Sequence, residues 1–219
     1  MSLILNLETS SKNCSVSLSS KGKLIDLIES EDENYRHSEL LTTSIQDILS
    51  KNNLNVKSLD AISVGIGPGS FTGLRIGLSV SKGLCYPHNI NLIGISTLKI
   101  LANSVNPVTD NIVCLINDKG NYFYMSKYNS DLEELIPPKI LLIDKEFIDK
   151  TINESTSIIV NTDSAYSYIS DISDKDLKLD KHVISSSNMI ELSQKAFDKK
   201  IFEDIAYVEP MYIKKPYVN

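Results

Sequence analysis

Residues 61–85 constrain the fold most, because they join a short apolar run to a long helical pattern through a turn of glycine and proline. Residues 61–66 are typical of a buried strand, and the turn Gly67-Pro68-Gly69 suits backbone angles that other residues disfavour. Ser70 is a good N-cap for a helix predicted over residues 70–85. This order of strand, tight turn and helix favours an α/β fold.

The start of this helix has two interpretations. The N–H groups at a helix N-terminus can hold an anion, so the turn is a candidate anion site. A well-capped strand-to-helix connection explains the same residues without a ligand. No Walker-type lysine follows the turn, so the sequence does not favour a nucleotide there.

The same helix carries small residues on one face. Gly73, Gly77 and Ser81 stand four residues apart, and Phe71, Leu74 and Leu78 line the adjacent face. Two interior glycines weaken a helix by about 1 kcal/mol each relative to alanine, so a close neighbour is expected to compensate. That neighbour is either another part of this chain or a helix of a second subunit.

Strands and helices alternate twice along the chain. In the first round, strands are predicted at 3–7, 14–18, 24–28, 61–66 and 90–95, and helices at 38–52, 70–85 and 97–105. In the second, strands are predicted at 112–116, 122–128, 140–143 and 157–160, and a helix at 188–199. The repetition predicts two related lobes with mixed sheets, 1–104 and 105–219, divided in a polar stretch around Pro107.

Composition indicates a soluble globular chain. Hydrophobic residues make up 42% and charged residues 23%, with no apolar run long enough to span a membrane and no signal-peptide pattern at the start. Cys14, Cys85 and Cys114 are odd in number and scattered, which suits neither a disulfide framework nor a zinc site. We expect a cytoplasmic protein.

The charge balance argues against direct nucleic-acid binding. Lysine and arginine number 22 against 28 acidic residues, which gives a net charge of -6 and a pI near 5.1. Phosphate neutralisation supplies most of the affinity for nucleic acids, and no Lys/Arg cluster with interleaved aromatics is present, since pairs such as Lys214 and Lys215 are too small to form a basic face.

The run GPGSFTGLRIG, residues 67–77, resembles the signature of the TsaB (YeaZ) family. The signature positions are Gly67, Pro68, Gly69, Ser70, Thr72, Gly73 and Arg75. Segments 5–10, 37–41, 59–62, 82–84 and 210–214 are similar to the family in the same order, so the resemblance is strong over residues 1–100 and clear again at the tail.

The resemblance implies an actin-like ATPase fold and a role without catalysis. Family members are implied to pair with the catalytic relative TsaD in building threonylcarbamoyladenosine (t6A) on tRNA. A TsaE-type ATPase is implied to dock on the pair, and a TsaC-type enzyme to supply threonylcarbamoyl-adenylate. We expect a homodimer when TsaD is absent, and contact with tRNA only through the complex.

Pairing is implied to use the first two helices of the N-terminal lobe. The interface residues predicted on this basis are Leu40, Leu41, Ile45, Phe71, Leu74, Gly77, Leu78 and Ser81. A bulky residue at Gly77 is expected to abolish pairing while leaving the monomer folded.

The sequence departs from the family at positions that matter for chemistry. Glu8 stands where aspartate is usual, and Asn117 and Lys119 replace an acid and an arginine, while Tyr124 remains. His37 is followed four residues later by Leu41, so the His-x-x-x-His metal pattern of TsaD is missing. No catalytic residue, metal or cofactor is therefore expected on this chain, and ATP and metal are expected on the partner subunits.

Two alternatives stay open. The first is an independent enzyme of the same fold, either an ATP-dependent phosphotransferase or a glycoprotease-like hydrolase. The second is a self-contained homodimeric scaffold with no role in tRNA modification.

Overall fold

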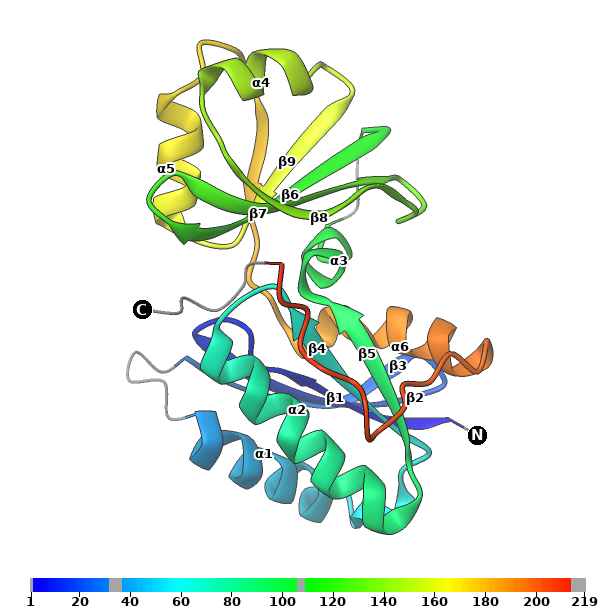
Figure 1. Ribbon diagram of the computed structural model, residues 1–219. Coiled ribbons are helices and arrows are strands. Elements are labelled where there is room, and N and C mark those ends of the chain that lie inside the picture. Colours follow the sequence, from blue (N-terminus) through cyan, green and yellow to red (C-terminus); the bar gives the residue numbers. More distant parts are fainter. Residues whose placement is uncertain (1, 32–36, 106–108, 214–219) are drawn as a thin grey trace. The chain divides into compact units, whose positions relative to one another are not determined.

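The chain forms two compact units (Figure 1). The computed structural model describes residues 2–31, 37–105 and 109–213, so Pro107, Lys214 and Lys215 lie outside the described residues. The first unit comprises Met1–Ile100 and Ile184–Met211, and the second comprises Leu101–Val183 and Tyr212–Asn219. The chain first passes from one unit to the other between Ile100 and Leu101, close to the division predicted around Pro107. Residues 184–211, however, return to the first unit, which the sequence pattern did not indicate.

The first unit is built on a mixed five-stranded sheet in the order β3-β2-β1-β4-β5. The strands are β1 (Leu3–Glu8), β2 (Asn13–Ser20), β3 (Lys23–Glu31), β4 (Ala61–Gly67) and β5 (Asn91–Ser96). β2 is antiparallel to both β1 and β3, while β4 is parallel to both β1 and β5. All five were predicted from the sequence, within a few residues at each end.

Helices α1 (His37–Lys51) and α2 (Phe71–Cys85) lie side by side on one face of this sheet (Figure 1). Their apolar residues, such as Ile48 and Leu78, share one core with Leu5, Leu7 and Val16 of the strands. Two short 3-10 turns, η1 (Val56–Ser58) and η2 (Tyr86–His88), follow the two helices. The pattern that predicted both helices reflects this single buried face.

The opposite face is covered by η3 (Ser186–Met189) and α6 (Ile190–Asp198). Hydroxyl groups attach η3 to β2: the Ser186 amide donates to Ser15 Oγ at 3.0 Å, and Ser17 Oγ donates to the Ser186 carbonyl at 3.0 Å. Further on, the Met211 amide donates to the Ile66 carbonyl at 2.7 Å. These bonds explain why the C-terminal part of the chain belongs to the first unit.

The second unit has a five-stranded sheet in the order β10-β9-β6-β7-β8. The strands are β6 (Asn111–Lys119), β7 (Tyr122–Asn129), β8 (Glu134–Leu142), β9 (Thr156–Val160) and β10 (Lys178–Lys181). β8 is an edge strand that contains Pro137 and Pro138, which suits an edge because proline cannot donate to a further strand. The predicted hairpin is confirmed as β6 and β7.

Helices α4 (Lys145–Thr151) and α5 (Asp163–Asp171) pack on this second sheet, and α3 (Thr97–Ala102) contains the boundary between the units. The sequence did not predict α4, α5 or β10. α4 is only seven residues long, and α5 is rich in Ser, Asp and Tyr, which are weak helix formers. Both helices begin at side-chain caps, Asp144 for α4 and Thr162 for α5. Among the described residues, no helix is long and apolar enough to span a membrane.

Candidate functional site

The glycine turn is fixed against the end of β1. Gly67 has a φ of 106°, a left-handed value that favours glycine, and it precedes Pro68 through a cis peptide bond. The Ser70 amide donates to the Ser10 carbonyl at 2.7 Å. A Cβ on Gly69 would lie only 2.6 Å from that same carbonyl oxygen, so glycine is required for the close approach.

The helix start has the predicted cap. Ser70 Oγ accepts a hydrogen bond from the Gly73 amide at 3.2 Å. Of the signature residues, Gly67, Pro68 and Gly73 are buried, Gly69 and Ser70 are half-buried, and Thr72 and Arg75 are exposed. The turn therefore works as a strand-to-helix connection, and anion binding there stays a prediction.

The small-residue face of α2 is turned toward the chain's own sheet. Thr9 Oγ1 donates to the Gly73 carbonyl at 2.8 Å, and a Cβ on Gly77 would collide with the same Thr9 hydroxyl. Ser81 is fully buried, and its hydroxyl donates to the Gly77 carbonyl at 2.8 Å. The close neighbour is thus intramolecular. The expectation that a bulky residue at Gly77 leaves the monomer folded does not fit this packing.

Most of the predicted interface residues belong to the core of the first unit. Leu41, Ile45, Leu74 and Leu78 are each at most 5% exposed, and Gly77 and Ser81 are buried with them. Leu40 is half-buried, and the Phe71 side chain is 41% exposed. Of the predicted set, only Leu40 and Phe71 are not buried, and Leu40 still packs in part against the core of the first unit.

The outer face of α2 carries a different set of residues. Thr72, Ser79 and Gly83 are exposed, and Ile76 and Val80 are half-buried beside them. A Cβ built on Gly83 would meet no atom within 4 Å, so the space above this glycine is open. We call these five residues the α2 outer strip. Helical spacing in the sequence already places Ser79 and Gly83 on a different face of the helix from Gly73 and Gly77. The sequence alone did not show which of these two faces is buried.

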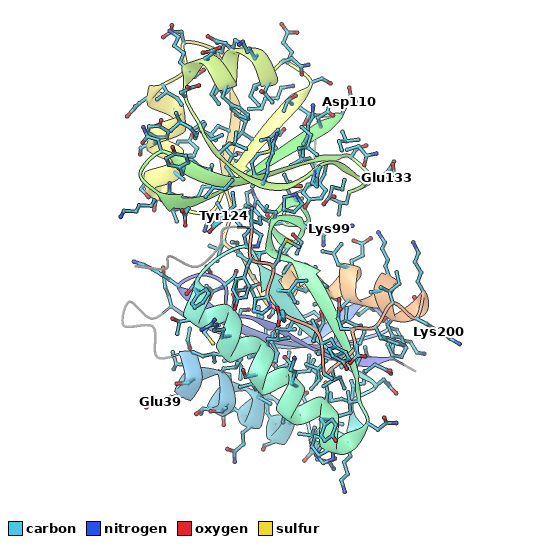
Figure 2. All side chains as sticks on the ribbon, viewed as in Figure 1. Glu39, Lys99, Asp110, Tyr124, Glu133 and Lys200 are labelled. Carbon is cyan, nitrogen blue, oxygen red and sulfur yellow. The ribbon has the colours of Figure 1, made fainter. Side chains whose placement is uncertain are left out.

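Charged groups flank the strip. The Arg75 guanidinium lies 3.7 Å from the centroid of the Phe71 ring, a cation–π contact at the first turn of α2. On α1, the exposed residues Glu39, Thr43, Gln46 and Asp47 form a polar, acidic surface, and Glu39 points away from the sheet (Figure 2). The α2 outer strip is thus uncharged, whereas the exposed side of α1 is polar and acidic.

Glu8 ends β1 on the other face of the sheet. Its side chain is fully buried, and its Oε1 atom accepts a hydrogen bond from the Ser10 amide at 2.6 Å. Burial raises the pKa of the Glu8 carboxyl, while hydrogen bonds from Ser10 and Thr9 oppose the shift. The carboxyl occupies the space where Gly65 would carry a Cβ.

The altered hairpin has a structural explanation. The Asn117 amide group donates to the Gly120 carbonyl at 2.8 Å, which closes the turn between β6 and β7. The Tyr124 hydroxyl donates to Asp118 at 3.1 Å, within the second unit (Figure 2). Asn117, which replaces the family's acid, therefore shapes this turn.

The thiols are buried. Burial raises the pKa of Cys14 to about 11, with a smaller contribution from Glu8, and raises the pKa of Cys85 to about 12. Cys114 is also buried, and its pKa is raised for the same reason. In the part of the chain that the structure describes, no three His, Cys, Asp or Glu side chains are grouped so that they could hold a metal ion.

Two compact units, each built on a mixed five-stranded sheet, define an α/β protein of the actin-like ATPase fold. The sequence matches the TsaD family, described as tRNA N6-adenosine threonylcarbamoyltransferase, over residues 31–218. The chain belongs to this family, as a member of the TsaB/YeaZ type.

Individual relatives agree with this assignment. The chain is 26% identical to the tRNA threonylcarbamoyladenosine biosynthesis protein TsaB of Haemophilus influenzae, over 96% of this chain and 93% of that protein. It is 31% identical to the Escherichia coli TsaB over 134 residues, which cover 58% of this chain and 55% of that protein. The structure of YeaZ from Pseudomonas aeruginosa has the same fold, with a TM-score of 0.82 and 21% identity over 97% of this chain and 100% of that one.

Proposed function

We propose that this chain takes part in t6A biosynthesis as a subunit that performs no catalysis and binds a TsaD-type catalytic partner. The match to a TsaB protein along nearly the whole chain and the match to the TsaD family support this role. The observation that carries the binding part of the proposal is the α2 outer strip, Thr72, Ile76, Ser79, Val80 and Gly83.

The strip has the properties that a helix-packing surface needs. Its residues are uncharged and mostly small, so the backbone of a partner helix can approach α2 closely. Gly83 is exposed in the interior of a helix, where glycine costs about 1 kcal/mol relative to alanine, and nothing in the described part of the chain fills the space above it. Close packing of a partner helix over Gly83 would explain why glycine stands at this exposed position instead of a better helix former.

Leu40 is half-buried and the Phe71 side chain is 41% exposed, so these two members of the interface predicted from the sequence are also available to a partner. Without the partner, two copies of the chain pair through the α2 outer strip, because the half-buried apolar residues still gain from being covered.

The subunit acts by changing the conformation of its partner. It stabilises the active arrangement of the TsaD-type subunit, since a partner that binds one conformation better shifts the population toward it. The pair also forms the surface on which a TsaE-type ATPase docks. Transfer RNA binds to the complex and only indirectly to this chain, whose net charge of -6 disfavours phosphate contacts.

The absence of catalysis is part of the proposal. Glu8, the residue that ends β1 where the fold's acid is implied, is buried and hydrogen-bonded to its own turn. Asn117, in the place of the second acid, closes a hairpin. An ATP-dependent phosphotransferase or a hydrolase is the alternative, and turnover of ATP or of a peptide by the purified chain is the result that would favour it.

The test is co-purification of this chain with the TsaD-type protein of the same genome, followed by a threonylcarbamoyl transfer assay with and without the chain. The decisive variant is Gly83→Glu, because a side chain fits the open space above Gly83 in the free chain but blocks close approach of another helix. The matched control is Ser167→Glu, which adds the same group at an exposed position of α5 in the second unit.

We expect the wild type and Ser167→Glu to form the complex and to support transfer, and Gly83→Glu to remain folded and to lose both. Equal pairing by Gly83→Glu would reject the α2 outer strip as the interface. Full transfer activity without the chain would reject the partner role as a whole.

A further inference from the structure

Tyr86 directly follows the C-terminal end of α2, and its side chain is 81% exposed. Among the large apolar and aromatic side chains of the described residues, only Tyr207, at 82%, is exposed to the same extent. An isolated apolar side chain on a protein surface is common and needs no explanation. Tyr86 is not isolated, because its position on the helix connects it to the α2 outer strip.

The helical conformation of α2 continues through Tyr86. Cys85 and Tyr86 both have right-handed helical φ and ψ angles, and the Tyr86 amide donates to the Lys82 carbonyl, as in an α-helix. Tyr86 therefore stands three residues after Gly83 and seven after Ser79 on one continuous helix. Residues at these spacings share one face of a helix. Tyr86 thus extends the α2 outer strip by about one further turn.

The extended strip ends at Tyr86. Pro87 and His88 complete η2, and Asn89 has a φ of 54°, a left-handed value that turns the chain away from the helix and toward β5. A Cβ on Gly83 would meet no atom within 4 Å, so the Tyr86 ring leaves the space above Gly83 open. The outer face of α2 therefore offers a partner a run of small and aliphatic residues that ends in one exposed ring.

The two parts of this face contribute to binding in different ways. The small residues let a partner helix approach closely, but they have little side-chain surface to bury. A tyrosine buries about 150–250 Å², and tyrosine is enriched among the few residues that carry most of the binding energy of protein interfaces. Its hydroxyl needs a hydrogen-bond partner once it is buried. The ring of Tyr86 is therefore the side chain on this face with most to gain from being covered.

We propose that Tyr86 is the anchor residue of this surface, and that the TsaD-type partner receives its ring in an apolar pocket that contains a hydrogen-bond acceptor. The inference rests on the proposed function and deepens it, because it states the chemistry that the partner must offer. The match to the TsaD family spans residues 31–218 and so includes both α1 and α2. A partner of that type is thus a related chain, with a corresponding helix to lay along the strip as far as Tyr86.

The test measures the Kd between the full chain and the TsaD-type protein of the same genome by isothermal titration calorimetry. Tyr86→Ser should raise the Kd at least about tenfold, because the anchoring ring is lost. Tyr86→Phe keeps the ring and should raise the Kd less, because only the hydroxyl bond is lost. The matched control Tyr207→Ser removes an equally exposed ring outside α2 and should leave the Kd within about twofold of the wild type.

All three variants should keep the circular dichroism spectrum of the wild type, because both tyrosines are exposed. An unchanged Kd for Tyr86→Ser would overturn the anchor. If Gly83→Glu loses binding in the same experiment, the proposed function still stands. Equal losses for Tyr86→Ser and Tyr207→Ser would also overturn the anchor, because the effect would then not depend on the position of the ring. Failure of the wild type to bind would instead reject the proposed function, and the anchor with it.

Discussion

The hydroxyl of Thr9 donates a 2.8 Å hydrogen bond to the carbonyl of Gly73, which connects the end of β1 to the first turn of α2. Both groups are buried. This contact positions α2 on the sheet, and so determines which face of the helix is left for other molecules.

Replacing Thr9 by valine should lower the free energy of unfolding by about 1–2 kcal/mol, because the shape is kept while the Gly73 carbonyl loses its buried donor. Urea unfolding followed by circular dichroism measures the change. The control is Thr43→Val at an exposed position of α1, which should stay within about 0.5 kcal/mol of the wild type. Equal effects of the two substitutions would contradict the role of the Thr9 contact.

Two alanine substitutions in α2 should have opposite effects. Gly77→Ala should destabilise the chain by about 1–3 kcal/mol, because the added methyl group collides with Thr9. Gly83→Ala should stabilise it by up to about 1 kcal/mol, because the space is open and alanine is the better helix former. Both values come from the same urea titration, and a stabilising Gly77→Ala would show that the small face does not pack closely against Thr9.

The Glu8 carboxyl should make stability depend on pH in a particular direction. Its pKa is raised in the folded chain, so the folded state holds this proton more tightly than the unfolded state, where the pKa is near 4.5. As the pH falls through the folded pKa toward 4.5, protonation of Glu8 should therefore favour the folded state progressively. Below pH 4.5 the contribution of Glu8 to the free energy of unfolding should stay constant. The difference between wild type and Glu8→Gln isolates this contribution, which can change by at most about 1.4 kcal/mol for each pH unit. Parallel pH curves for the two proteins would refute this prediction.

The three cysteines should be almost unreactive in the folded chain. All three are buried, and the pKa values of Cys14 and Cys85 are raised to about 11 and about 12, so little thiolate is present at about pH 8. Labelling with a disulfide reagent should be at least about 100-fold slower in native buffer than in urea, where all three thiols react. Fast labelling of one thiol in native buffer would show that its surroundings open readily.

Local chemistry was enough to predict much of the fold. The glycine turn, the Ser70 cap and the apolar periodicity of α1 and α2 depend on residues that are neighbours in the chain, and the structure has them as expected. The five strands of the first sheet and the hairpin of β6 and β7 follow from the same kind of short-range pattern, whereas β10 and the first half of β8 were not predicted. The resemblance carried by residues 67–77 also pointed to the family that the comparisons support.

Contacts between distant parts of the chain decided the rest. Gly73, Gly77 and Ser81 are equally suited to pack against a strand or a second subunit, and only the position of Thr9 shows that they face the sheet. The return of α6 to the first unit depends on serine contacts between β2 and η3, about 170 residues apart in sequence. The buried polar side chains of Asn6, Glu8 and Ser63 come to one face of the sheet only because β4 pairs with β1. A sequence determines the periodicity of a helix or strand, whereas the partner of each face is set by the packing of the whole chain.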